Sequence, residues 1–191
     1  MDAVGLARLG GVFVSFMSGN TTNIGVALAR LDGDHAAVAA LVVGLFVVGV
    51  VVGEFTRPVG GKHGRGLVLL LVAILLGVAT AAARGRVGPM TVAGPMVLAM
   101  GAQNAASRRI GSADFGTTYV TGTLVHLGAA LAAGLRGQSF GNSGALLMMW
   151  IGLVTGALLG TVALRYGPDA ALAVPAAGAL LLSVWALFRR E

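Results

Sequence analysis

The sequence predicts an all-α polytopic membrane protein, with about six transmembrane helices among six to eight segments, arranged as two internal repeats with broken helices at equivalent positions. Three observations predict this class. The 191 residues are 57% hydrophobic and only 10% charged, whereas soluble domains contain about 25% charged residues. Long apolar runs follow one another with short polar connections, and the mean hydropathy is +0.89. A polar motif near the N-terminus recurs in the second half of the chain.

The apolar runs are expected to be helices, because they are continuous and rich in Leu, Ala and Val, without the alternation of barrel strands. A span needs about 20 mainly apolar residues. Five runs meet this length: Ala36–Phe55, Gly66–Ala83, Met90–Ala106 with its flanks, Ala145–Leu164 and Ala170–Phe188, which contains Pro175. Two further segments, Gly11–Ala29 and Thr117–Leu135, are interrupted by polar residues, and Ala3–Leu9 is too short to cross alone.

Charge and composition exclude several classes of protein. The net charge is +6, but the basic residues are scattered over the connections and form no face for nucleic acid. If the interrupted segments do not cross, eight basic residues share one side and five the other, which favours cytoplasmic termini. Cysteine is absent, which excludes disulfides and thiol chemistry. No metalloprotease, nucleophile-elbow or P-loop motif occurs, so we expect neither an enzyme nor a metal or cofactor.

The interrupted segment FVSFMSGNTTNIGVALA, Phe13–Ala29, has a counterpart 103 residues further along the chain. Five of the twelve positions from Ser18 to Ala29 are identical under this shift, where chance in such a chain gives about one or two. The repeat predicts a first half over residues 1–87 and a second over residues 88–191. Three full spans in each half would make the repeats inverted and four would make them parallel, and the sequence leaves both open.

Both copies place a small hydroxyl residue before glycine, Ser18-Gly19 and Thr121-Gly122, at the start of an apolar run. Such hydroxyls cap helices, and glycine permits a break. We therefore expect two half-helices entered from non-helical backbone, which survives at membrane depth only beside protein or water. Helix N-termini favour anionic groups. Paired breaks at matching positions indicate the central site of a transporter.

The candidate site residues lie at the two breaks and on the neighbouring spans. Those at the breaks are Ser18, Gly19, Asn20, Thr21, Thr121, Gly122, Thr123 and His126, and those lining the path are Asp2, Gln103 and Asn104. The structural alternatives are capping and kink repair at the breaks, and hydrogen bonds between helices for the others. For His126, a proton relay competes with an ordinary hydrogen bond within the bundle.

Five glycines on two spans form a further pattern, with small residues four positions apart. They are Gly49 and Gly53 in the first half and Gly152, Gly156 and Gly160 in the second. Such faces allow close packing of membrane helices. They are expected to join either the two halves or two protomers.

Three motifs resemble those of the YoaK-like family of bacterial membrane proteins: Asp2-Ala3 with VFVSFMSGNTT, where the family shows F-x-x-x-M-T-G-N; GAQNAASRRIG, Gly101–Gly111; and TTYVTGTL, Thr117–Leu124. The resemblance implies about six spans in the bacterial cytoplasmic membrane, and some members are described as permeases, without a substrate. Ser18 stands where the family commonly has Thr. The family also usually has an apolar run before the aspartate, so the first span here is expected to be truncated.

The leading hypothesis is a small secondary transporter that works without ATP on an unidentified small solute or ion. Its broken helices would face each other near the midplane, and the repeats would rock to give alternating access. About six helices make a thin wall, which favours a homodimer within the lipid bilayer. The alternatives are a channel along the same path and a non-transporting scaffold or assembly protein.

Overall fold

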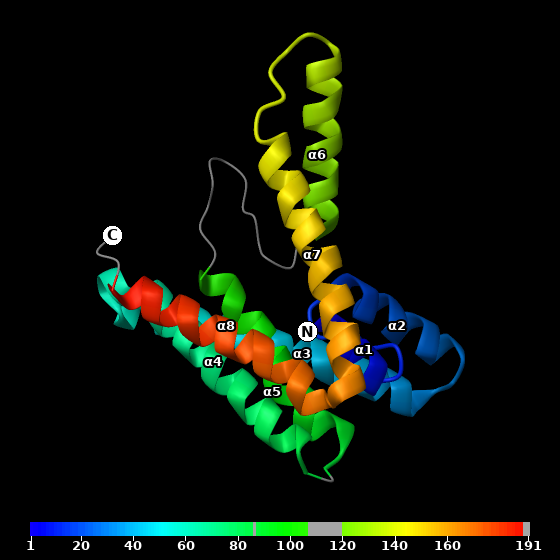
Figure 1. Ribbon diagram of the computed structural model, residues 1–191. Coiled ribbons are helices and arrows are strands. Elements are labelled where there is room, and N and C mark those ends of the chain that lie inside the picture. The colour runs from blue at the N-terminus through cyan, green and yellow to red at the C-terminus, as the bar shows by residue number, and fades with distance from the viewer. Residues whose placement is uncertain (86, 107–119, 189–191) are drawn as a thin grey trace.

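The computed structural model describes residues 1–85, 87–106 and 120–188, and these residues form helices and turns with no strand. The predicted all-α class is therefore confirmed. In chain order the α-helices are α1 (Asp2–Arg8), α2 (Met17–Ala29), α3 (Gly33–Val59), α4 (Gly64–Ala83), α5 (Pro89–Ala106), α6 (Val120–Leu135), α7 (Ser143–Ala163) and α8 (Pro168–Phe188). Two short 3-10 helices, η1 (Gly61–His63) and η2 (Leu164–Tyr166), precede α4 and follow α7 (Figure 1).

Four of the described helical segments are long and apolar enough to cross a membrane: Gly33–Val59, Gly61–Ala83, Ser143–Tyr166 and Pro168–Phe188. They coincide with four of the five predicted spans. The fifth prediction corresponds to α5, whose 18 residues measure about 27 Å at 1.5 Å per residue. Its polar residues lie near its end, and it packs against both α3 and α4. The protein is thus a multi-pass membrane protein.

The buried core lies where α5 meets its neighbours. Val42 of α3, Ala79 of α4, Val97 of α5 and Leu172 of α8 belong to one buried cluster and are fully shielded. Apolar residues on the outside of the molecule are exposed; Phe55, for example, is 75% accessible. Apolar residues on the outside suit faces that contact lipid chains.

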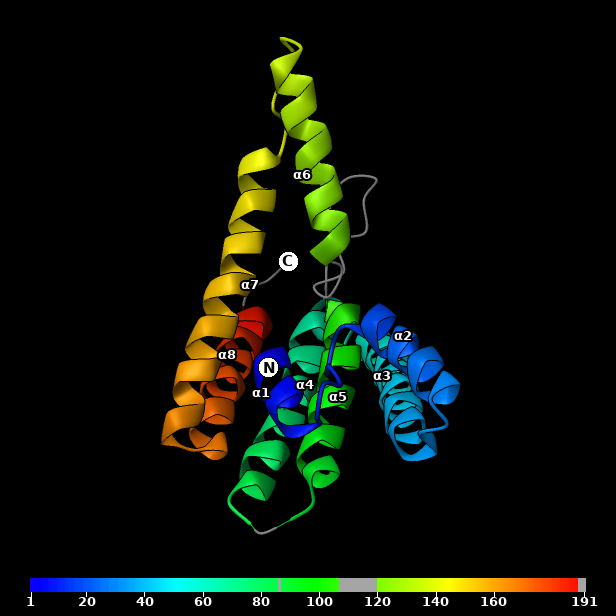
Figure 2. The same cartoon turned by 90° about the vertical axis from the view of Figure 1, so that its right-hand side faces the viewer.

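α6 and the first part of α7 project away from the layer made by α3, α4, α5 and α8, and the rest of α7 lies beside that layer (Figures 1 and 2). α6 packs along α7, and α7 also contacts α1 and α8. α2 lies on the other side of the layer, along α3 (Figure 2). The helices of the two interrupted segments, α2 and α6, therefore belong to two separate hairpins, one with α3 and one with α7.

Candidate functional site

The first predicted break lies between α1 and α2. α1 ends at Arg8 and α2 begins at Met17, and the eight residues between them are not helical. Gly10 and Gly11 adopt φ angles of +60° and +101°, which glycine tolerates because it has no Cβ. Val12 and Val14 are fully buried. The middle of the non-helical segment is thus shielded by protein, whereas Gly10 and Phe16 are exposed.

Asn20, in the first turns of α2, holds one end of this segment. Its Oδ1 accepts a hydrogen bond from the backbone N–H of Phe13 at 2.9 Å, and its Nδ2 donates to the carbonyl of Phe13 at 2.7 Å. The side chain is fully buried. Asn20 therefore satisfies both backbone groups of Phe13, as a neighbouring strand would.

Asp2 of α1 holds the other end. Its Oδ1 accepts hydrogen bonds from the backbone N–H groups of Val14 at 3.0 Å and Ser15 at 2.8 Å. The Ser15 hydroxyl donates to Oδ2 of the same carboxylate. Asn23 of α2 adds a hydrogen bond from its Nδ2 to the carbonyl of Gly11 at 3.2 Å. Polar side chains from both flanking helices thus replace the hydrogen bonds that a continuous helix would have made.

Ser18 does not cap α2, and the predicted cap is wrong. The N-cap residue is Phe16, and no side-chain hydrogen bond caps the helix. Ser18 lies exposed within the first turn, and its carbonyl accepts from the hydroxyl of Thr22 at 3.1 Å. The hydroxyl of Thr21 donates to the carbonyl of Met17 at 2.9 Å. The first N–H groups of a helix have no intrahelical partner, so the start of α2 keeps polar groups available.

Gly19 leaves room for an aromatic ring at the break. The ring of Phe16 folds back over the helix, and a Cβ at Gly19 would overlap it. Phe16 also meets the ring of Phe13 edge-on, with centroids 5.3 Å apart. The Ser-Gly-Asn motif therefore combines an open position for an aromatic ring with an amide that secures the backbone.

α2 is too short to cross the membrane by itself. Its 13 residues span about 20 Å, and only residues 30–32 separate it from the start of α3, along which it packs. The hydrocarbon layer is about 30 Å thick. α2 is therefore shorter than the hydrocarbon layer is thick.

The second predicted break is described only from α6 onward. Residues 107–119, which carry parts of the second and third motifs, lie outside the described residues. Thr121 is exposed, whereas Gly122 and Thr123 are buried. A shallow hollow of about 40 Å³ is lined by Val120, Thr123, Met149, Trp150 and Leu153. The start of α6 therefore lies against the middle of α7.

The remaining polar candidates are distributed over other helices. Gln103 and Asn104 are half-buried near the end of α5, where Nδ2 of Asn104 donates to the carbonyl of Met100 at 2.9 Å. His126 lies exposed on α6. α2 and α6 do not pack along each other within the described part of the chain. No group of three metal-binding side chains occurs among the same residues.

The two glycine faces differ in their surroundings. A Cβ at Gly53 would lie 2.7 Å from the carbonyl oxygen of Ala102, and one at Gly49 would overlap the backbone of Leu98. These glycines therefore let α3 approach α5, which joins the two predicted halves. A Cβ added at Gly152, Gly156 or Gly160 of α7 would meet no described atom within 4 Å.

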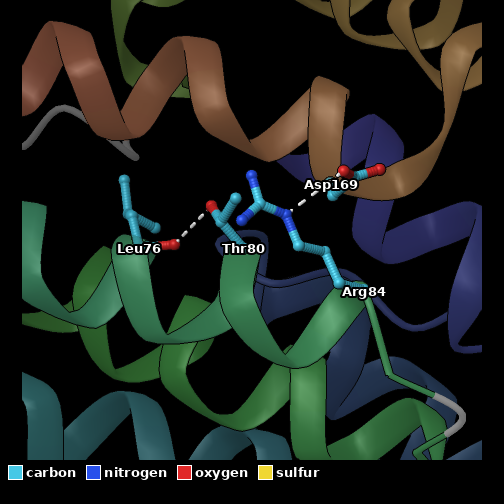
Figure 3. A network of polar contacts seen from close by, with 4 residues as sticks. All are labelled: Leu76, Thr80, Arg84 and Asp169. Atoms are coloured by element: carbon cyan, nitrogen blue, oxygen red, sulfur yellow. Dashed lines mark hydrogen bonds and ion pairs between the residues drawn. The ribbon is translucent and has the colours of Figure 1, made fainter.

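Sequence reasoning missed the polar contacts between α4 and α8. Nε of Arg84 lies 3.5 Å from Oδ2 of Asp169, beside Thr80, whose hydroxyl donates to the carbonyl of Leu76 at 2.7 Å (Figure 3). At the other end of the pair, the buried hydroxyl of Ser183 donates to the carbonyl of Gly66 at 2.9 Å. No local signal could have revealed these contacts, because the partners are distant in the sequence.

Comparisons with known proteins agree with this description. The family model described as "Protein of unknown function (DUF1275)" matches residues 1–185. The chain is 38% identical over 186 residues to the UPF0700 transmembrane protein RA0705 of Rhizobium meliloti (strain 1021), covering 95% of this chain and 78% of that relative. No solved structure matches.

Proposed function

Because the chain belongs to the DUF1275 family and is 38% identical to a UPF0700 transmembrane protein, we propose that it is a small secondary transporter of a small polar or anionic solute. The observation that carries the proposal is the break before α2. Non-helical backbone adjoins an uncapped helix N-terminus there, and with the connection to α3 at the membrane surface the short α2 would begin inside the hydrocarbon layer. Discontinuous helices of this kind supply the substrate sites of many transporters.

The polar groups at the break fall into two sets, those that bind the backbone and those that remain available to a solute, and this supports the proposal. The backbone of residues 11–15 forms hydrogen bonds with the side chains of Asp2, Asn20 and Asn23. The groups left for a solute are the first N–H groups of α2 and the exposed hydroxyl of Ser18. A helix N-terminus carries partial positive charge. We therefore assign substrate contact to the start of α2, and by repetition to Thr121 at the start of α6, with no catalytic step.

The test is a thermal-shift measurement on the purified protein in detergent. The probes are defined solutes: sodium and potassium salts of inorganic anions, short carboxylates, amino acids and nucleobases. A solute at 100 times its Kd raises the unfolding free energy by about 2.7 kcal/mol. We expect one class to raise Tm in the native chain and to lose that effect in Ser18→Ala and Thr121→Ala.

Thr161→Ala is the matched control, because Thr161 is exposed on α7 and its hydroxyl only donates to the carbonyl of Ala157. This variant should keep the full solute response. A stable sample that responds to no probe, or a response that survives in both Ser18→Ala and Thr121→Ala, would contradict a solute site at the half-helices.

A further inference from the structure

We infer that the two halves of the chain are inverted copies, so that α2 enters the membrane from one face and α6 from the opposite face. The functional meaning of this arrangement rests on the proposed transporter, because it places one half-helix on each side of the path. The topology itself does not depend on transport.

The helices of the two halves correspond under the shift of 103 residues. α2 starts at Met17 and the described part of α6 starts at Val120, which are counterparts. α4 (Gly64–Ala83) corresponds to residues 167–186, and α8 covers Pro168–Phe188. The duplicated sequence has therefore produced duplicated helices.

The packing also repeats. α2 packs on α3 as α6 packs on α7, and α3 contacts α4 as α7 contacts α8. α4 and α8, which are counterparts, pack directly against each other. Exchanging the halves therefore maps these contacts onto one another, as a pseudo-two-fold axis requires.

The contact between α4 and α8 gives the direction of that axis. Near the start of α4, the carbonyl of Gly66 bonds to Ser183, which lies near the end of α8. Near the end of α4, Arg84 pairs with Asp169, which lies near the start of α8 (Figure 3). The two helices therefore run antiparallel, with the end of α8 beside the start of α4 (Figure 1). Counterparts that run in opposite directions define inverted repeats.

Both ends of this contact use equivalent positions. A Cβ at Gly66 would lie 2.7 Å from the side chain of Leu187. Gly66 and Leu187 are the counterparts of Asp169 and Arg84 under the same shift. The pairing of positions is thus symmetric, although the ion pair exists at one end and an apolar contact at the other.

The orientation of the half-helices follows from these directions. α3 turns back into α4 through η1, and α7 turns back into α8 through η2. Because α4 and α8 are antiparallel, α3 and α7 also run in opposite directions. α2 leads directly into the start of α3, and α6 leads into the start of α7. The two half-helices therefore approach the midplane from opposite faces.

Single cysteines test this topology, since the chain has none of its own. Lys62 and Arg165 are exposed counterparts in η1 and η2, and Leu31 and Gln138 are exposed in the connections before α3 and α7. Each variant is treated with a charged, membrane-impermeant maleimide on intact cells and then after permeabilisation, which should label all four. We expect Lys62→Cys and Gln138→Cys to react from one side, and Leu31→Cys and Arg165→Cys from the other.

Parallel repeats would instead place Lys62→Cys with Arg165→Cys, and Leu31→Cys with Gln138→Cys. Any grouping other than the expected one overturns the inference. Val59→Cys and Tyr166→Cys repeat the comparison without removing a positive charge, and both sites are more than 80% accessible, at 83% and 82%. If the four cysteines are labelled as expected but the native chain responds to no solute, the transporter is refuted and the inversion stands. If a solute response is found but the labelling shows another grouping, the inversion is refuted and the transporter stands.

Discussion

The polar residues at the first break act first on the protein's own backbone. Asn20 and Asp2 together bond to Phe13, Val14 and Ser15. An unsatisfied backbone group in hydrocarbon costs several kcal/mol, so hydrogen bonds from these side chains would permit a non-helical segment at that depth. The structural alternative that the sequence left open is thus present at Asn20 and Asp2, and it builds the half-helix on which the proposed site depends.

Replacing Asn20 with alanine should destabilise the protein. The N–H and C=O of Phe13 would both lose their partners, and each unsatisfied buried group costs about 1–3 kcal/mol. Thermal unfolding in detergent should show a clearly lowered Tm. Asn142→Ala is the matched control, because Asn142 is exposed and its side chain makes no capping bond. Equal Tm values for the two variants would contradict the role of Asn20.

Two substitutions at Asp2 should lower Tm to different extents. Asp2→Asn keeps an oxygen that accepts from Val14 and Ser15, whereas Asp2→Ala removes every acceptor. Hydrogen bonds to a charged group contribute about 1.5–3 kcal/mol, so we expect alanine to lower Tm more than asparagine. Unfolding curves of the two variants in the same detergent provide the measurement. A larger decrease in Tm for Asp2→Asn than for Asp2→Ala would show that Asp2 does not hold the segment by accepting hydrogen bonds.

The sequence predicted the break but not the way it is built. Glycine beside small polar residues marked the interruption, because those residue types oppose a continuous apolar helix. The cap was wrong because α2 begins at Met17, one residue before Ser18. Asp2 reaches Ser15 across 13 positions, and no local pattern specifies such a contact.

At the scale of elements, the apolar runs predicted the helices closely because their ends coincide with polar or glycine-rich connections. The run Ala36–Phe55 became α3, Gly33–Val59, and the run Gly66–Ala83 became α4, Gly64–Ala83. Directions and neighbours could not be predicted, because an apolar helix carries little information about which other helix it meets. The projection of α6 and the first part of α7 away from the central layer was likewise absent from the sequence pattern.

The two glycine faces should respond differently to the same change. Gly53→Ala places a Cβ against the carbonyl of Ala102, so α3 and α5 must move apart. Gly156→Ala meets no described atom within 4 Å, and alanine is favoured over glycine in a helix by about 1 kcal/mol. We expect a lower Tm for Gly53→Ala and an unchanged or higher Tm for Gly156→Ala. The opposite order would contradict the α3–α5 packing.

The pairing of α4 with α8 should depend on Ser183. Its buried hydroxyl bonds to the carbonyl of Gly66 in the other helix, so Ser183→Ala should cost about 1 kcal/mol or more. Arg84 and Asp169 are 70% and 37% accessible in their side chains, and exposed pairs contribute little. Thermal unfolding of Ser183→Ala, compared with Thr161→Ala, measures the difference. Identical Tm values would contradict the interhelical bond.

At the scale of the whole molecule, the inverted arrangement explains why the unusual polar stretch occurs twice. α2 packs along α3 as α6 packs along α7, and the antiparallel α4–α8 pair relates the two copies. Rocking of inverted halves about a central site is a general means of exposing that site to each face in turn. The sequence could reveal the duplication, but only the contacts between α4 and α8 reveal its orientation.

The proposed transporter requires both half-helices to start beside water at membrane depth. Its most direct test is the reactivity of Ser18→Cys and Thr121→Cys in proteoliposomes with a hydrophilic, membrane-impermeant thiol reagent on both sides. Thiols react as thiolates, which form readily only in contact with water. Leu158→Cys and Leu181→Cys, at outward-facing positions that are 62% and 71% accessible, are the lipid-facing controls. We predict that Ser18→Cys and Thr121→Cys react and that the controls do not; reactivity as low as that of the controls at both positions would contradict the account.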